Sequence, residues 1–228
     1  MTKLRTFAAV AAVAAMLLVM TGCQMAPWLA WFFAKPEKVE PVCTIPPDVK
    51  MLVLISDLEL SETADCAAIK RSLTENLNEQ LLEHEVATEV VSYEELLDFI
   101  AAEPTFHQLS FGEIAEKLGA DLVLYVRLKQ FKLRDTAIST LWRGELDVRV
   151  KLVDKNDITL FPVDTPLGHA ARVEFSDERD ESETYGATLT DMLGSEMADR
   201  IAKLFYQHEV PPGTKAQQQR EEAVGDDV

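Results

Sequence analysis

The sequence predicts a single α/β domain in which helices pack on a mixed β-sheet. Short, continuously apolar runs alternate with helices in the first half of this domain, which is typical of parallel strands buried on both faces. Alternating apolar and polar strands follow one another in the second half, as antiparallel hairpins do. A final amphipathic helix completes the order β-α-β-α-α-β-β-β-β-α over residues 51–208.

A buried strand and an amphipathic helix open the domain. Residues 51–55 are apolar at every position, which indicates burial on both faces of a sheet. Ser61 can cap the helix that follows, whose apolar side chains recur every four residues as a buried stripe. This stripe consists of Ile69, Leu73, Leu77 and Leu81.

A second strand, over residues 86–91, precedes two further helices. Each helix begins with a serine that is followed three residues later by a glutamate, which is the spacing of a capping box. We expect the first of these helices to stop before Pro104 and the second to end at Gly119, in a left-handed conformation. The capping pairs are Ser92 with Glu95 and Ser110 with Glu113.

Antiparallel strands and one helix complete the domain. Residues 122–126 form a strongly apolar strand, and a change of phase between Leu128 and Phe131 predicts a bulge. From residue 142 to residue 152 apolar and charged positions alternate, so one face of this strand should be solvated. Two shorter strands, residues 158–161 and 171–175, and a helix with an apolar stripe from Leu189 to Phe205 follow.

The first 22 residues have the three-part layout of a secretory signal. Two basic residues precede an apolar run over residues 7–19, which is shorter than the roughly 20 residues that a membrane-spanning helix needs. The small pair Thr21-Gly22 and then Cys23 follow. We therefore expect export of the chain and removal of residues 1–22.

The boundary Met20-Thr21-Gly22-Cys23 resembles the lipobox of bacterial lipoproteins. This resemblance implies that the Cys23 thiol receives a diacylglyceryl group and that its amine is acylated after cleavage. Two or more acyl chains, such as palmitate, hold a protein stably on a bilayer. Gln24 stands where an aspartate would retain an enterobacterial lipoprotein at the inner membrane, so we expect an outer-membrane protein on the periplasmic side of the envelope.

Residues 23–50 are expected to connect this anchor to the domain. The aromatic stretch over residues 25–33 either lies against the lipid headgroups or packs on the globular domain. Four prolines between residues 34 and 50 indicate an extended tether. At the other end of the chain, residues 209–228 are expected to be disordered.

The chain is strongly acidic, with 39 acidic and 22 basic residues and a net charge of −17. Removal of the signal peptide with its two basic residues would make the charge about −19. Such an excess argues against nucleic acid and against anionic lipid as docking partners. We therefore expect attachment to the membrane through the acyl chains, with the acidity serving solubility.

Cys43 and Cys66 would share a compartment in which disulfides form. Cys43 precedes the first strand and Cys66 lies in the first helix, so one bridge between them is feasible. The sequence leaves two alternatives open, a disulfide or two free thiols.

Motifs that carry catalysis or metal binding are missing from the sequence. His84-Glu85 begins like a metalloprotease motif, but Thr88 stands where the second histidine would be. Asp57 and Glu59 follow the first strand, where open parallel sheets place ligands, and we retain them as a possible ligand-facing loop beside the simpler interpretation of a solvated loop. We expect a protein that is not an enzyme and needs no cofactor or metal.

Residues 114–126 resemble a recurring element of small envelope proteins, in which a helix ending in Leu-Gly-Ala-Asp leads into a buried strand. This element occurs in the curli-secretion channel lipoproteins, the penicillin-binding-protein activator lipoproteins and the N-terminal domain of the Tol translocation protein. Residues 144–154, Gly-x-Leu-x-Val-x-Val-x-Leu-Val-Asp, are similar to the partner strand of those domains. The resemblance covers about residues 50–208 and implies scaffolding, secretion or partner activation rather than catalysis.

These observations predict a lipid-anchored protein that binds a protein partner, or another copy of itself, at the cell envelope. The alternative is a binder of a small molecule or lipid in envelope assembly or transport, which a pocket lined by aromatic side chains would favour. A third possibility is an extracytoplasmic hydrolase, which converging titratable groups would favour.

Overall fold

The computed structural model describes residues 36–56, 64–134, 141–180 and 183–211. The chain divides into two compact units, Pro41–Tyr206 and a smaller unit from the flanking segments. Across the described ranges, no helix combines the length and the apolar character that crossing a membrane would require.

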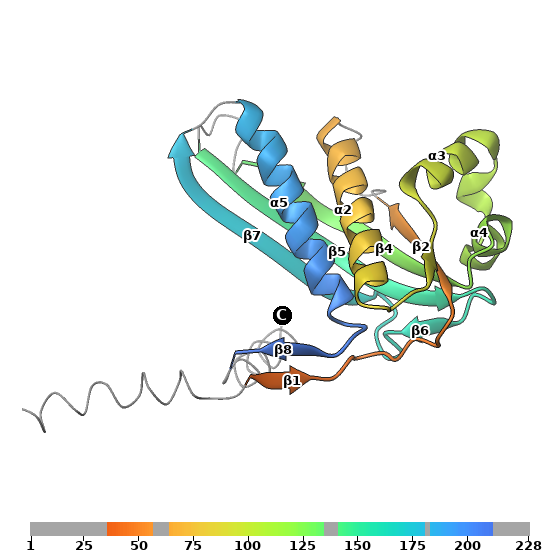
Figure 1. Ribbon diagram of the computed structural model, residues 1–228. Helices are drawn as coiled ribbons and strands as arrows, with labels where there is room; N and C mark the ends of the chain where they lie inside the picture. Colours follow the sequence, from red (N-terminus) through yellow and green to blue (C-terminus); the bar gives the residue numbers. More distant parts are fainter. Residues whose placement is uncertain (1–35, 57–63, 135–140, 181–182, 212–228) are drawn as a thin grey trace, which may run out of the picture. The chain divides into compact units, whose positions relative to one another are not determined.

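The larger unit has the predicted mixed α/β fold, a six-stranded sheet with helices packed on it (Figure 1). The strand order is β3-β2-β4-β5-β6, and β7 also pairs with β5. The strands are β2 (Lys50–Ser56), β3 (Glu89–Val90), β4 (Leu122–Lys132), β5 (Leu141–Asp154), β6 (Thr159–Phe161) and β7 (His169–Asp180). The helices are α2 (Ala64–Glu83), α3 (Tyr93–Ala102), α4 (Phe111–Leu118) and α5 (Glu183–Ala202), with a 3₁₀ turn at Phe106–Gln108.

The pairing of the strands agrees with the prediction. β2 pairs in parallel with β3 and β4, because helices connect these three strands. β5 pairs antiparallel with β4, β6 and β7. The expected bulge is present, since the register of β4 against β5 shifts between Leu128 and Gln130.

Helices cover both faces of the sheet at β2. Met51 and Val53 belong to the core under α2 and α5, whereas Leu52 and Leu54 belong to a second cluster under α3 and α4. The side chains of a strand point alternately to opposite faces, so a strand that is buried on both faces must be apolar throughout. This explains the continuous apolar run that the sequence shows.

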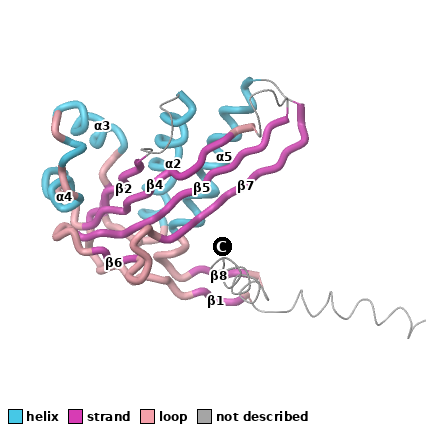
Figure 2. Tube along the Cα trace, turned by 180° about the vertical axis from the view of Figure 1, so that it is seen from behind, coloured by secondary structure: helices cyan, strands magenta, loops and turns pink. Residues whose placement is uncertain are grey.

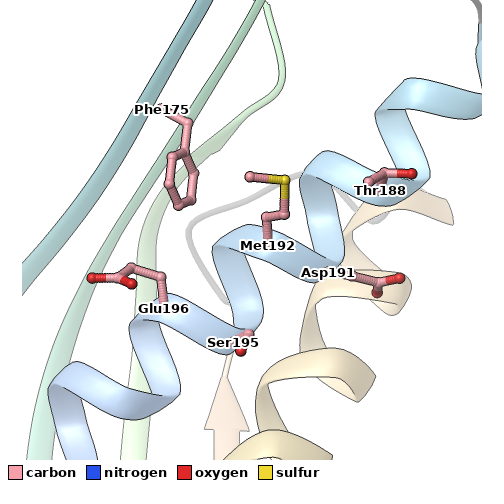
Figure 3. A pocket seen from close by; sticks show the side chains of 6 residues that line it. All are labelled: Phe175, Thr188, Asp191, Met192, Ser195 and Glu196. Atoms are coloured by element: carbon pink, nitrogen blue, oxygen red, sulfur yellow. The ribbon is translucent and has the colours of Figure 1, made fainter.

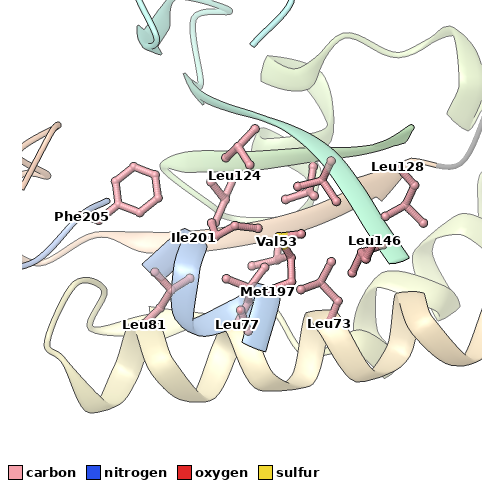
Figure 4. Close-up of a cluster of buried hydrophobic side chains, with 14 of the residues drawn as sticks. Val53, Leu73, Leu77, Leu81, Leu124, Leu128, Leu146, Met197, Ile201 and Phe205 are labelled. Carbon is pink, nitrogen blue, oxygen red and sulfur yellow. The ribbon is translucent and has the colours of Figure 1, made fainter. Parts of the chain in front are cut away.

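The main core lies between the sheet and the helix pair α2–α5. The predicted stripe of α2 is fully buried, with no exposed surface on any of its four side chains. Figure 4 shows side chains of α2, α5 and the sheet meeting in this core. Each fully buried leucine contributes about 1.5–3 kcal/mol relative to an exposed one. The members from α5 are Leu189, Leu193, Met197, Ala198 and Ile201.

Two glycines allow α5 to approach its neighbours closely. A Cβ atom at Gly194 would lie 2.5 Å from the Ser72 hydroxyl oxygen of α2, and one at Gly144 would lie 2.9 Å from a methyl carbon of Leu193. Both distances are too short for carbon in van der Waals contact. Glycine is therefore the residue that lets α5 pack against α2 and β5 at this depth.

The predicted caps of α3 and α4 are confirmed. The Ser92 hydroxyl accepts a hydrogen bond from the backbone N–H of Glu95 at 3.1 Å. Ser110 and Glu113 form a reciprocal capping box at the start of α4. Gly119 ends this helix in the left-handed conformation, with φ of 64°.

The second strand is shorter than predicted. Residues 86 and 87 do not pair in the sheet, because the backbone N–H groups of Val86 and Ala87 donate to the Leu81 carbonyl and close the end of α2. Their apolar side chains are buried all the same. Val86 and Ala87 are apolar because they are buried in the turn that ends α2. In the sequence this pattern is the same as that of a buried strand.

The proline-containing segment is not only a tether. The Val42 N–H donates to the Leu204 carbonyl at 2.8 Å, Ile45 packs against the core, and Val49 is buried. In the smaller unit, β1 (Glu37–Val39) pairs antiparallel with β8 (His208–Val210), two strands that the sequence did not predict. The expected signal peptide, aromatic stretch and most of the expected disordered tail lie outside the described residues.

Candidate functional site

Three of the predicted site residues lie outside the described residues. These are Cys23, the expected lipid attachment site, and Asp57 and Glu59 of the expected ligand-facing loop. Their assigned roles therefore stay predictions.

No disulfide joins Cys43 and Cys66 in this structure, which corresponds to one of the two alternatives left open by the sequence. Cys43 is half-buried, and burial raises the pKa of its thiol. Cys66 is buried in α2. A raised pKa disfavours the thiolate, which is the reactive form of cysteine.

His84 packs against an aromatic side chain. Its ring stacks on that of Tyr206 with 3.8 Å between the centroids. Burial, together with the carboxylates of Asp199 and Glu83, raises the pKa of the Tyr206 phenol. Among the described residues, no group of three or more histidine, cysteine or carboxylate side chains could hold a metal ion. The stacking gives His84 a packing role.

A shallow hollow lies between α5 and the edge strand β7 (Figure 3). Its volume is about 460 Å³, and it is widely open to solvent. Phe175 and Met192 are its apolar side chains, and Met192 is 41% exposed. Small-molecule sites enclose most of their ligand, so an open hollow of this kind does not favour the small-molecule alternative. The other lining residues are Thr188, Asp191, Ser195 and Glu196.

The second face of the sheet is only half covered. α3 and α4 pack over β2 and the first part of β4, and at the β5–β6 turn the Gly112 N–H of α4 donates to the Asp157 carboxylate at 2.8 Å. No described helix covers most of β5 and β7 on this side, as Figure 2 shows. We call this uncovered surface of β4, β5 and β7 the open sheet face.

Basic side chains outnumber acidic ones on the open sheet face. The register places Arg127 of β4 opposite Arg149 of β5, and Arg172 of β7 opposite Asp147 of β5. Alternation along each strand puts the other side chains of this set on the same face. Its described charged residues are the basic Arg127, Lys132, Arg143, Arg149, Lys151 and Arg172 and the acidic Glu145, Asp147 and Glu174.

Ion pairs hold the three carboxylates of this face. Arg172 lies 2.5 Å from Glu145 and 3.5 Å from both Asp147 and Glu174. Arg143 also pairs with Glu174, and this hydrogen-bonded guanidinium holds the pKa of Glu174 below its ordinary value. At Asp147, burial outweighs the charge of Arg172, so the pKa of this carboxyl is raised. The face keeps an excess of positive charge in a chain whose net charge is −17.

The sequence predicted one row of this face and missed the others. The alternation from residue 142 to 152 identified the charged side chains of β5. Arg127, Lys132 and Arg172 were missed, because a strand's partners and register depend on contacts distant in sequence. The alternation of apolar and polar residues around Val173 could have shown that Arg172 points to the face opposite Val173.

Asp121 and Asp154 lie in the two segments on which the family resemblance rests, and both have structural roles. The Asp121 carboxylate accepts a hydrogen bond from the Lys50 N–H at 3.2 Å, and the Asp121 N–H donates to the Lys50 carbonyl. The Asp154 carboxylate accepts hydrogen bonds from the N–H groups of Asn156 and Ile158, both at 2.8 Å. These residues fix the entry to β2 and β4 and the β5–β6 turn.

No family model and no curated protein matches this sequence. Among solved structures, the PelC dodecamer from Paraburkholderia phytofirmans is similar, with 11% identity, a TM-score of 0.41, and coverage of 76% of this chain and 99% of that one. Lipoprotein GNA1162 from Neisseria meningitidis has 15% identity and a TM-score of 0.42 over 68% of this chain and 98% of its own. A minor lipoprotein from Acinetobacter baumannii has 9% identity and a TM-score of 0.37, over 68% and 89%. Similar structures thus include bacterial lipoproteins.

Proposed function

We propose that this protein is a lipid-anchored, non-enzymatic binding subunit of the bacterial cell envelope. It docks a protein partner, or a further copy of itself, on the open sheet face. The observation that carries the proposal is a broad strand surface that no described helix covers and whose charge is opposite in sign to that of the chain.

The ion pairs prepare this surface for binding. Arg172 lies among three carboxylates, so neighbouring side chains are already held in place before a partner arrives. Side chains ordered in advance lose less entropy on binding. The excess of basic residues on the face would attract an acidic protein surface and select against a basic one.

The N-terminal sequence supports the location. A basic start, an apolar run and the small pair before Cys23 together support export and lipid attachment on the periplasmic side, and Gln24 supports the outer membrane. An anchored domain meets its partners in two dimensions, which raises their effective concentration. A modest affinity would therefore suffice for assembly.

Photo-crosslinking in cells that produce the protein tests this proposal. A photoreactive amino acid replaces Ala170, which is exposed on β7 opposite Arg149, and in a control it replaces Glu79, which is exposed on α2 on the other side of the sheet. We expect a discrete protein adduct from position 170 and none from position 79. Arg149→Glu should abolish the adduct. The absence of an adduct at position 170, or equal adducts at both positions, would overturn the proposal.

A further inference from the structure

We propose that a second copy of the chain occupies the open sheet face and that it binds there with its helices α3 and α4. This inference rests on the proposed function, because it uses the same docking face, and it names the partner. Two observations support this inference. Among the described residues, helices cover only half of one side of the sheet, and the covered and uncovered halves have opposite charge.

One side of the sheet is divided into a covered half and an uncovered half. α3 and α4 lie over β2 and the first part of β4, whereas most of β5 and β7 has no described helix on that side (Figure 2). Two copies that face each other about a two-fold axis parallel to the strands would place the helices of each on the uncovered strands of the other. Such a contact stops at the dimer, because the α3–α4 surface and the open sheet face of each copy are both occupied by the other copy.

The two surfaces have opposite charge. From residue 92 to residue 120 the chain carries six carboxylates and one cation, Lys117, which pairs with Glu103 at 2.8 Å. The open sheet face carries six cations and three carboxylates. The contact would therefore set a surface of net charge −5 against one of net charge +3, twice in each dimer. The carboxylates of the helical surface are Glu94, Glu95, Asp98, Glu103, Glu113 and Glu116.

The acidic side chains of α3 point away from their own sheet. Leu96 is buried in the cluster beneath α3, while Glu94 and Asp98 are exposed on the opposite side of the helix. Leu97, which is 40% exposed, lies between them in sequence and adds apolar surface. The outer side of α3 thus offers charge and apolar area to a partner rather than to its own core.

The helix pair α2–α5 lies on the other side of the sheet from the open sheet face. It therefore cannot meet the open sheet face of a second copy in a closed two-fold contact, whereas α3 and α4 can. Glu75 and Glu79 are exposed on α2 with the same spacing as Glu94 and Asp98 on α3. They provide a matched control.

Sedimentation velocity of the full chain in density-matched detergent tests the inference. The variants are Glu94→Lys with Asp98→Lys on α3, Arg149→Glu with Lys151→Glu on β5, all four changes together, and the control Glu75→Lys with Glu79→Lys. We expect a dimer for the parent chain, at least about a tenfold rise in the dissociation constant for each of the first two pairs, and recovery in the fourfold variant. The control pair should dimerise like the parent. Raising the salt from about 50 to about 500 mM should weaken the parent dimer.

A monomeric parent chain would overturn the inference. An unchanged dissociation constant in either of the first two charge-reversal variants would also overturn it, and so would an equal rise in the control variant. Failure of the fourfold variant to recover would overturn the pairing of α3 with β5. The proposed function would stand apart from these results. If the parent is a monomer while position 170 still crosslinks to another protein in cells, the face is a docking site for a different partner and only the second-copy inference fails.

Discussion

The carboxylate of Asp154 fixes the backbone of the turn between β5 and β6. Asp154 receives the N–H groups of Asn156 and Ile158, and the hydrogen bond from Ile158 is the main cause that lowers the pKa of this carboxyl from its ordinary value of 3.8. A carboxyl whose pKa is lower in the folded chain stabilises the fold above its unfolded pKa. That stabilisation is lost as the pH falls through the folded pKa.

We therefore expect Asp154→Ala to lower the melting temperature at pH 7 and to have a smaller effect at about pH 3, below the ordinary carboxyl pKa of 3.8, where the stabilisation by the charged form has begun to decrease. Thermal unfolding followed by circular dichroism at both pH values measures this. Asp164→Ala, a change on an exposed loop, is the control and should melt like the parent at both. An equal loss at the two pH values would show that the charge of Asp154 is not the cause.

Gly119 is needed for its backbone conformation alone. Its φ is 64°, and a Cβ atom placed there would have no atom within 4 Å apart from those of its neighbours along the chain. Gly119→Val should therefore cost about 1–2 kcal/mol of unfolding free energy through strain, without a clash. Gly119→Asn should cost less, since asparagine tolerates the left-handed region. Urea denaturation measures both, and equal losses for Val and Asn would contradict the explanation.

At the scale of the element, β4 is the central strand of the core. Val123 faces the cluster under α3 and α4, and Leu124 faces the cluster under α2 and α5, each with no exposed surface. A carboxylate at either position would be buried without a partner. We expect Val123→Asp and Leu124→Asp each to destabilise the fold by more than about 3 kcal/mol.

Chemical denaturation of the purified variants measures this effect on β4. Lys132→Ser, at the exposed end of the same strand, is the control and should change the unfolding free energy by less than about 0.5 kcal/mol. If either aspartate variant unfolds like the parent, β4 is not buried on the side where that residue lies.

The elements that the sequence predicted well are those defined by local patterns. The stripe of α2, the serine caps and Gly119 depend on residues within a turn or two, and the structure confirms them. The pairing of β7 with β5 and of β1 with β8 joins segments far apart in the chain, for which no local pattern exists. The open sheet face was predictable along β5 but not across the strands, since Arg172 comes to Asp147 only through that pairing.

At the scale of the whole molecule, net charge and surface charge lead to different expectations. A net charge of −17 favours solubility and causes long-range repulsion between copies. Docking depends instead on the faces that meet, and the open sheet face and the α3–α4 surface have opposite signs. Lipid anchoring would bring such copies close enough for short-range attraction to act.

The anchor itself is testable at this scale. The small pair followed by Cys23 predicts that Cys23→Ala moves the protein out of the membrane fraction and abolishes incorporation of labelled palmitate. Cys43→Ala, a change at a half-buried thiol, is the control and should leave both unchanged. Continued labelling of the Cys23→Ala variant would refute the lipobox assignment.

The boundary of the folded domain gives the last prediction. Val42 is hydrogen-bonded to Leu204, Ile45 packs on the core and Val49 is buried, so residues 41–49 are part of the domain rather than a tether. A fragment over residues 41–206 should therefore fold and should be more stable than one over residues 50–206. The difference should reach about 2 kcal/mol or more, because the shorter fragment loses the buried Val49 and the partly buried Ile45 and leaves the Leu204 carbonyl without its donor. Urea denaturation of both fragments measures it. Equal stability would mean that this segment only lies on the surface and that the domain begins with β2.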